Sequence, residues 1–107
     1  MSYIIKKLTI KDRLILLSIL PAKGSLIVMM HVKNLIDKLS FDDKELEEYK
    51  IRQENSFVTW DNDEEYYKEV QFNSEEIEIL KKQIKQKDEA QEILFEMIET
   101  FNKIINN

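Results

Sequence analysis

Glycine and proline are scarce in this chain, and this scarcity excludes several fold classes. Its 107 residues include one Gly and one Pro. Collagen-like chains, low-complexity chains and β-sandwiches built on many tight turns all need more of these residues. Hydrophobic residues form 43% of the chain and charged residues 35%, which is typical of a globular domain with a charged surface. We therefore expect residues 1–107 to form a single domain around one hydrophobic core.

The chain contains no cysteine, which excludes disulfides, cysteine zinc sites and thiol nucleophiles. Its longest apolar stretch, residues 14–30, is interrupted by Pro21, Lys23 and Gly24. This stretch is too broken for a membrane span and lies too far from the N-terminus for a signal peptide. These features predict a cytoplasmic protein that has no membrane partner.

Charge divides the chain into a basic and an acidic part. Residues 1–40 carry a net charge of +5, and residues 41–107 carry a net charge of −10. Because phosphate repels a net-acidic protein at long range, nucleic acid is a disfavoured partner. A basic face for nucleic acid could come only from the N-terminal part.

Cap residues followed by apolar residues at helical spacing predict five helices. Thr9 and Asp12 have the spacing of a capping box, and Pro21 ends the first helix. Polar residues at Lys87 and Gln91, where the apolar stripe should continue, favour two C-terminal helices over one helix of about thirty residues, which is the alternative. The predicted helices cover Ile10–Leu20, Leu26–Leu39, Asp42–Tyr49, Glu75–Lys87 and Glu89–Ile105.

Between residues 50 and 72 the apolar pattern changes from helical to alternating. Runs at 50–53 and 57–60 predict a β-hairpin, and residues 66–72 alternate well enough for a third strand, so we expect an antiparallel sheet of two or three strands across 50–72. Residues 1–8 form an extended lead-in. The predicted fold class is α+β: a helix-dominated single domain with an N-terminal helical hairpin, a small antiparallel β-sheet and C-terminal helices. The middle positions of the apolar stripes predict a core that includes Leu14, Leu17, Val32, Leu35, Leu80, Leu94 and Ile98.

No motif in the chain predicts catalysis or metal binding. His31, the single histidine, borders the inner face of the second helix, where a histidine is usually a hydrogen-bonded boundary residue. The acidic run that begins at Asp61 starts like a calcium loop, but Tyr66 stands where the loop needs Gly and Phe72 where it needs Glu. The adjacent carboxylates at 42–43 and 47–48 lie in a polar stretch and lack the burial that acid–base catalysis requires. We expect a non-enzymatic protein with no cofactor and no metal.

Three helices followed by a hairpin are also the order of a winged helix-turn-helix domain, so a DNA-binding regulator is an alternative function. A recognition helix should present Arg, Lys, Asn or Gln to the bases. Residues 41–49 instead hold five acids and one lysine. Direct reading of the major groove is therefore disfavoured.

The segments 8–14 (LTIKDRL), 17–21 (LSILP), 39–41 (LSF) and 58–60 (VTW), together with Gly24 and Phe101, resemble small uncharacterised phage and prophage proteins. The resemblance covers nearly the whole chain and consists of apolar and cap residues, without a catalytic motif. It implies a viral or mobile-element origin, a location in the host cytoplasm, and binding to a host or phage protein. It also implies a further alternative, an acidic DNA mimic that inhibits a host nuclease or defence system.

The acidic excess lies beside the aromatic-rich hairpin. Exposed rings there could anchor a partner protein, and carboxylates could attract a basic one. A face that only keeps the domain soluble explains the same charges equally well. The predicted protein-binding residues are Asp42, Asp43, Glu47, Glu48, Asp61, Asp63, Glu64, Tyr66 and Tyr67. The C-terminal helices could also join copies of the chain in a homo-oligomer.

Overall fold

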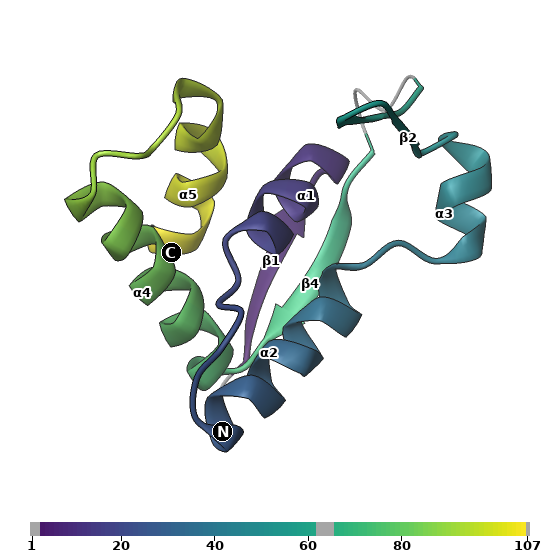
Figure 1. Cartoon of the computed structure of the whole chain (residues 1–107). Coiled ribbons are helices and arrows are strands. Elements are labelled where there is room, and N and C mark those ends of the chain that lie inside the picture. Colours follow the sequence, from purple (N-terminus) through teal and green to yellow (C-terminus); the bar gives the residue numbers. More distant parts are fainter. Residues whose placement is uncertain (1–2, 62–65, 107) are drawn as a thin grey trace.

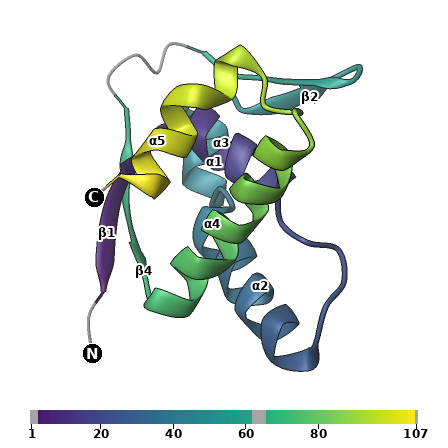
Figure 2. The ribbon, with the colours of Figure 1, turned by 90° about the vertical axis from the view of Figure 1, so that its left-hand side faces the viewer.

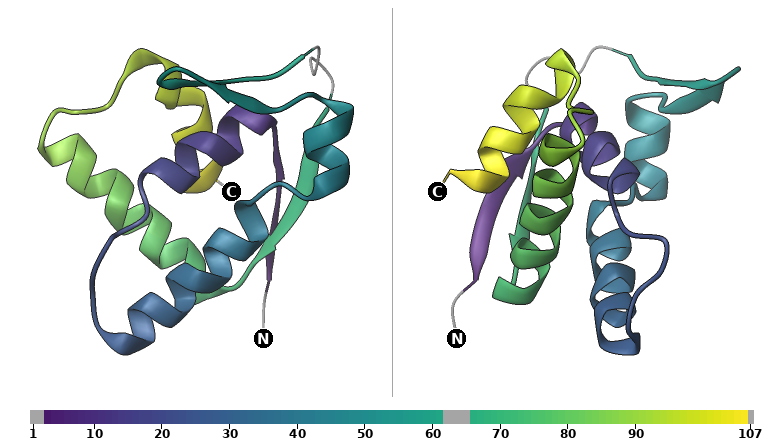
Figure 3. Two further views of the ribbon diagram at one scale, coloured as in Figure 1. Left: turned by 45° about the vertical axis from the view of Figure 1, so that its right-hand side comes forward. Right: turned by 60° about the vertical axis from the view of Figure 1, so that its left-hand side comes forward.

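The first and last strands of the chain form a two-stranded antiparallel sheet, and helices cover one of its faces (Figures 1 and 3). The structure, a computed structural model of the whole chain, describes residues 3–61 and 66–106. It is a compact α+β domain, as the sequence predicts. The elements follow in the order β1 (Ile4–Leu8), α1 (Ile10–Ser18), α2 (Leu26–Leu39), α3 (Asp43–Glu48), β2 (Arg52–Glu54), β3 (Phe57–Thr59), β4 (Lys68–Phe72), α4 (Ser74–Glu89), a 3-10 turn η1 (Phe95–Met97) and α5 (Ile98–Ile105).

The two sheets are separate. Strand β1 pairs with β4, with Ile4 opposite Phe72, and β2 pairs only with β3. The predicted hairpin is confirmed, but β4 does not join it as a third strand. Buried Val70 and Phe72 alternate in β4 with exposed residues, so this strand lies against the core, whereas every residue of β2 is exposed. The hairpin projects from the domain (Figure 3).

Local cap signals place the starts of the first four helices within one residue of the predicted positions, whereas the last helix starts at Ile98 and not at Glu89 as predicted. Capping boxes form between Thr9 and Asp12 at α1, and between Asn73 and Glu76 at α4. A Ser25 cap begins α2, whose bounds are those predicted. Helix α1 ends two residues earlier than expected, and α3 loses one residue at each end of its predicted range.

The C-terminal region contains two helices, as predicted, but the break lies beyond the predicted position at 87–88. Helix α4 continues to Glu89 because its end is closed by a Schellman motif. In this motif Gln91 takes a left-handed φ of 59°, and the backbone N–H of Glu92 donates to the carbonyl of Lys87 at 2.9 Å. Because glutamine rarely occupies this position, composition alone does not reveal it.

The core lies between the sheet and the helices α1, α2, α4 and α5. The prediction is confirmed for Val32, Leu35 and Leu80, which are buried, whereas Leu14 and Leu17 are only partly buried. It is wrong for two exposed residues, one that precedes η1 and one at the start of α5. The break after α4 resets the helical phase, so α5 turns Phe101 and Ile104 inward instead. The two wrongly predicted core residues are Leu94 and Ile98.

Candidate functional site

A buried ion pair connects the acidic helix α3 to the rest of the domain. The guanidinium of Arg13 in α1 is fully buried and binds both carboxylate oxygens of Glu45, with Nη1 2.6 Å from Oε2 and Nη2 3.0 Å from Oε1. The same guanidinium donates to the carbonyls of Leu39 and Ser40 at the end of α2. Phe41 covers it, with its ring centroid 4.1 Å from Cζ. Arg13 therefore sets the position of α3 relative to α1 and α2.

The Glu45 carboxylate receives two further hydrogen bonds, from the backbone N–H of Asp42 and from the hydroxyl of Tyr66. Burial alone would raise the pKa of Glu45, but the hydrogen bonds from Arg13, Tyr66 and Asp42 outweigh it and lower this pKa to about 2. Burial and the bond to Glu45 raise the pKa of Tyr66 to about 12. Tyr66 also stacks on Tyr49, with ring centroids 4.3 Å apart. This network joins α3 to the chain that leads into β4.

The hairpin is tied to the end of α3. The backbone N–H of Ile51 donates to the carbonyl of Leu46 at 3.1 Å, and that of Asp61 donates to the carbonyl of Tyr49 at 2.8 Å. The hairpin carries Phe57, whose side chain is 72% exposed. The acidic helix and the hairpin therefore form one connected surface unit.

The predicted protein-binding residues divide into three groups. The carboxylates on and around α3 and at the end of the hairpin are all exposed, and they are Asp42, Asp43, Glu47, Glu48 and Asp61. Tyr66 is half-buried with its hydroxyl bound to Glu45, whereas Tyr67 is exposed and lies beside β1, with Lys7 Nζ 5.1 Å from its ring centroid. Asp63 and Glu64 lie outside the described residues. Residue order alone did not reveal that Glu45, in the middle of the acidic run, is the buried carboxylate.

His31 lies in α2. It is partly buried, as expected for a boundary residue, but its buried Nδ1 has no hydrogen-bond partner within the described residues. No group of three or more His, Asp or Glu side chains in residues 3–61 and 66–106 could hold a metal ion. In the same residues, no helix combines the length and apolar character needed to cross a membrane.

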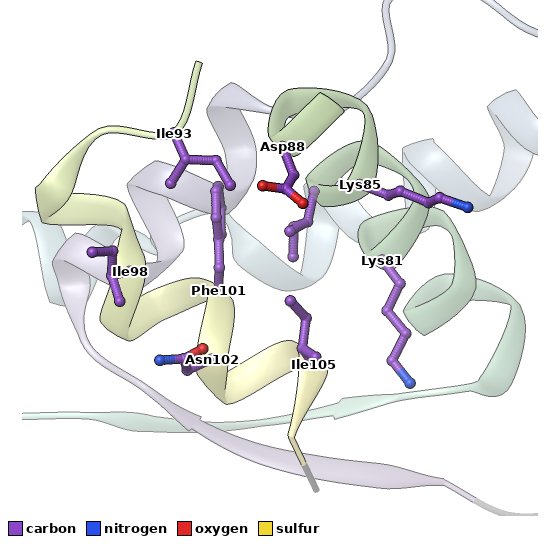
Figure 4. Close-up of a pocket in the computed structure, with 9 residues that line it drawn as sticks. Lys81, Lys85, Asp88, Ile93, Ile98, Phe101, Asn102 and Ile105 are labelled. Atoms are coloured by element: carbon purple, nitrogen blue, oxygen red, sulfur yellow. The ribbon is translucent and has the colours of Figure 1, made fainter. Parts of the chain in front are cut away.

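A second feature is a pocket of about 510 Å³ between α4 and α5. Its walls are mainly apolar, and Figure 4 shows Ile93, Phe101 and Ile105 directed into it. Lys81 and Lys85 extend from its α4 rim. The pocket has the composition of a contact surface for apolar groups, with charges only at its edge.

Helix α5 is fixed beside this pocket by a second buried carboxylate. Asp12 at the start of α1 accepts hydrogen bonds from the hydroxyl of Thr100 and from Nζ of Lys103. Burial would raise the pKa of Asp12, but the bonds from Lys103, Thr100 and the backbone of Thr9 lower it overall. The outer face of α5 is therefore presented in a defined orientation.

Comparisons of the chain with protein-family models, with curated proteins and with solved structures gave no match.

Proposed function

We propose that this chain is a non-enzymatic accessory protein, of the kind that phages and mobile elements encode, and that it binds another protein through the surface around α3. This α3 surface comprises the exposed residues Asp42, Asp43, Glu47, Glu48 and Asp61, the adjoining hairpin, and the further predicted residues Asp63, Glu64, Tyr66 and Tyr67. The observation that carries the proposal is the rigid attachment of α3, because Arg13 and Glu45 hold a short helix that could not persist alone. A binding surface gains affinity when its groups are already in place.

The charge of the α3 surface supports a basic partner. Between residues 42 and 61, six exposed carboxylates accompany three exposed cations. Two of these carboxylates, Glu54 and Asp61, are engaged by Arg52 at 2.6 and 3.4 Å, and those of α3 remain as the main source of negative potential. Such a potential speeds association with a positively charged protein and is screened by salt.

The aromatic part of the surface differs from its predicted composition. Tyr66 supports Glu45 from a half-buried position, so it contributes to the shape of the surface more than to contact. Phe57 lies in β3 of the hairpin and is far more exposed, which makes it the better anchor for a partner's apolar pocket. We include Phe57 in the α3 surface on this basis.

The winged-helix alternative gains no support from this geometry. Helix α3 has six residues, and among its exposed charged side chains Lys44 is outnumbered by Asp43, Glu47 and Glu48. A helix of this charge is repelled by the phosphates that line the major groove.

The test compares the proteins that three forms of the chain capture from bacterial lysate. The forms are the wild type, Glu47→Lys with Glu48→Lys in α3, and a control that combines Glu89→Lys, at the last residue of α4, with Glu92→Lys, three residues beyond it. Each double variant replaces two glutamates with lysines, so both change the net charge equally. All four residues are exposed, so neither variant should disturb the core. We expect one stoichiometric protein on the wild type and the control, and at least about tenfold less of it on the α3 variant.

The proposal is contradicted if no protein is captured stoichiometrically, or if all three forms capture the same protein equally. For a captured protein, added salt should slow association with the wild type more than with the α3 variant. A Phe57→Ser variant then tests the anchor: we expect faster dissociation with a nearly unchanged association rate. If the wild type instead retains DNA in a strongly salt-dependent complex, the regulator alternative is favoured.

A further inference from the structure

The outer side of η1 and α5 carries apolar side chains that the rest of the chain leaves exposed to solvent. Phe95 is 91% exposed, Leu94 55% and Ile98 47%, and Ile105 is exposed to the same degree as Ile98. Ile98, Phe101 and Ile105 of α5 follow intervals of three and four, which is the spacing of an apolar stripe on a helix, and Leu94 precedes η1. Of these four positions, only Phe101 is buried. The sequence pattern thus predicts burial at residues that the monomer leaves in solvent.

This apolar face has a basic flank. Ile98 and Asn102 line both the α4–α5 pocket and a second hollow on the other side of α5, so they form a ridge between two flanks. On the pocket side of the ridge, Lys81 and Lys85 outnumber Asp88. That flank is therefore positive as well as apolar.

The other flank has the opposite charge. The hollow there is lined by Glu96 and Glu99, with Lys11 of α1 as the one cation among its lining residues, and it also contains Phe95. One molecule thus carries an acidic flank with a protruding ring on one side of α5, and a basic flank with an apolar pocket on the other. Each flank complements the other in charge and in shape.

We infer that this face joins two copies of the chain in a twofold dimer, in which Phe95 of each copy enters the α4–α5 pocket of the other. A twofold axis running along the ridge places the acidic flank of each copy over the basic flank of its partner, and the two α5 helices lie parallel. An axis running across the ridge would place like charges together and is excluded by repulsion. The contact is isologous and closes at two copies.

The dimer would leave the α3 surface free. Helices α4 and α5 lie on one side of the domain, and α3 lies on the other (Figures 1 and 2). A dimer therefore presents two α3 surfaces that point away from the contact, and it could engage two sites of one assembly.

The test measures the mass of the full chain in solution by light scattering and sedimentation over a range of concentrations. We expect twice the chain mass of 12.9 kDa at about 100 µM for the wild type. Phe95→Glu should raise the dimer dissociation constant at least about 100-fold, because it places a charge where the ring enters the pocket. The control is Leu26→Glu, at a residue of α2 that is 78% exposed, and it should leave the constant unchanged.

A charge exchange tests the direction of the twofold axis. Lys85→Glu and Glu99→Lys should each weaken the dimer by about tenfold, and the combination should restore it to within about threefold of the wild type. All variants should keep the wild-type melting profile under conditions where the chain is monomeric, because the changed residues are exposed. A monomeric wild type at about 500 µM, or a dimer that Leu26→Glu weakens as much as Phe95→Glu, would overturn the inference. A dimer that the charge exchange fails to restore overturns the parallel arrangement.

Discussion

Replacing Glu45 with glutamine is the sharpest test of how this fold is held together. The substitution keeps the size of the side chain and removes the charge that Arg13 binds. Arg13 retains its bonds to the carbonyls of Leu39 and Ser40, so the buried guanidinium stays partly satisfied. What is lost is the ion pair itself and the attachment of α3.

Two independent estimates give the size of the effect. The pKa of Glu45 falls from its ordinary value of 4.5 to about 2. At 1.36 kcal/mol for each pKa unit, this shift corresponds to about 3 kcal/mol of stability at pH 7. Removing one partner of a buried pair usually costs about 3–5 kcal/mol. We therefore expect Glu45→Gln to lower the free energy of unfolding by about 3 kcal/mol at pH 7.

The pH dependence identifies the cause. A carboxylate with a lowered pKa stabilises the fold above its unfolded pKa, and this stabilisation is lost as the pH falls toward the folded pKa. For Glu45 the loss occurs between about pH 4.5 and pH 2. The difference between wild type and Glu45→Gln should fall to about 2 kcal/mol at pH 3.5 and to below about 0.5 kcal/mol at pH 2. Urea titrations of both proteins at several pH values measure this difference directly.

The matched control is Glu47→Gln, at an exposed position of the same helix. It should change stability by no more than about 0.5 kcal/mol. A cost of Glu45→Gln below about 1 kcal/mol at pH 7, or an equal cost at pH 7 and pH 3.5, would show that the ion pair with Arg13 does not stabilise the fold as described.

Two further predictions concern the core and Tyr66. Leu35→Ala should lower the free energy of unfolding by about 2–5 kcal/mol, because this side chain is fully buried. Leu94→Ala should lower it by less than about 1 kcal/mol, because Leu94 is 55% exposed. Equal costs in thermal or urea unfolding would show that Leu94 is buried and that the assigned inner face of the C-terminal region is wrong. The phenol of Tyr66 should titrate near pH 12, above the usual tyrosine value of 10.0, and ultraviolet titration of the wild type against Tyr66→Phe isolates it. Tyr66→Phe should also raise the pKa of Glu45, and the variant should therefore unfold in acid at a higher pH than the wild type. A Tyr66 phenol that titrates at the usual tyrosine value would contradict the hydrogen bond between Tyr66 and Glu45.

Much of the α3 surface could be located from the sequence, but its internal support could not. Runs of charged residues outside an apolar stripe are usually solvated, and Asp42, Asp43, Glu47 and Glu48 are indeed exposed. Glu45 belongs to the same run and is buried, because Arg13, thirty-two positions earlier, reaches it. Nothing local distinguishes Glu45 from its neighbours, since its burial depends on how α1, α2 and α3 pack.

Short-range patterns were enough to predict the α+β class, the cap residues and the bounds of α2, because these depend on contacts within three or four positions. Long-range packing was needed to pair β4 with β1, at positions sixty or more apart in the chain, and not with the nearby hairpin. The tertiary structure also decided the end of α4, through a left-handed Gln91 that no composition rule predicts. That end resets the phase of α5 and leaves Leu94 and Ile98 in solvent. Short-range hydrogen bonding determines where an element begins, whereas the side that it buries depends on the neighbours that the whole chain brings together.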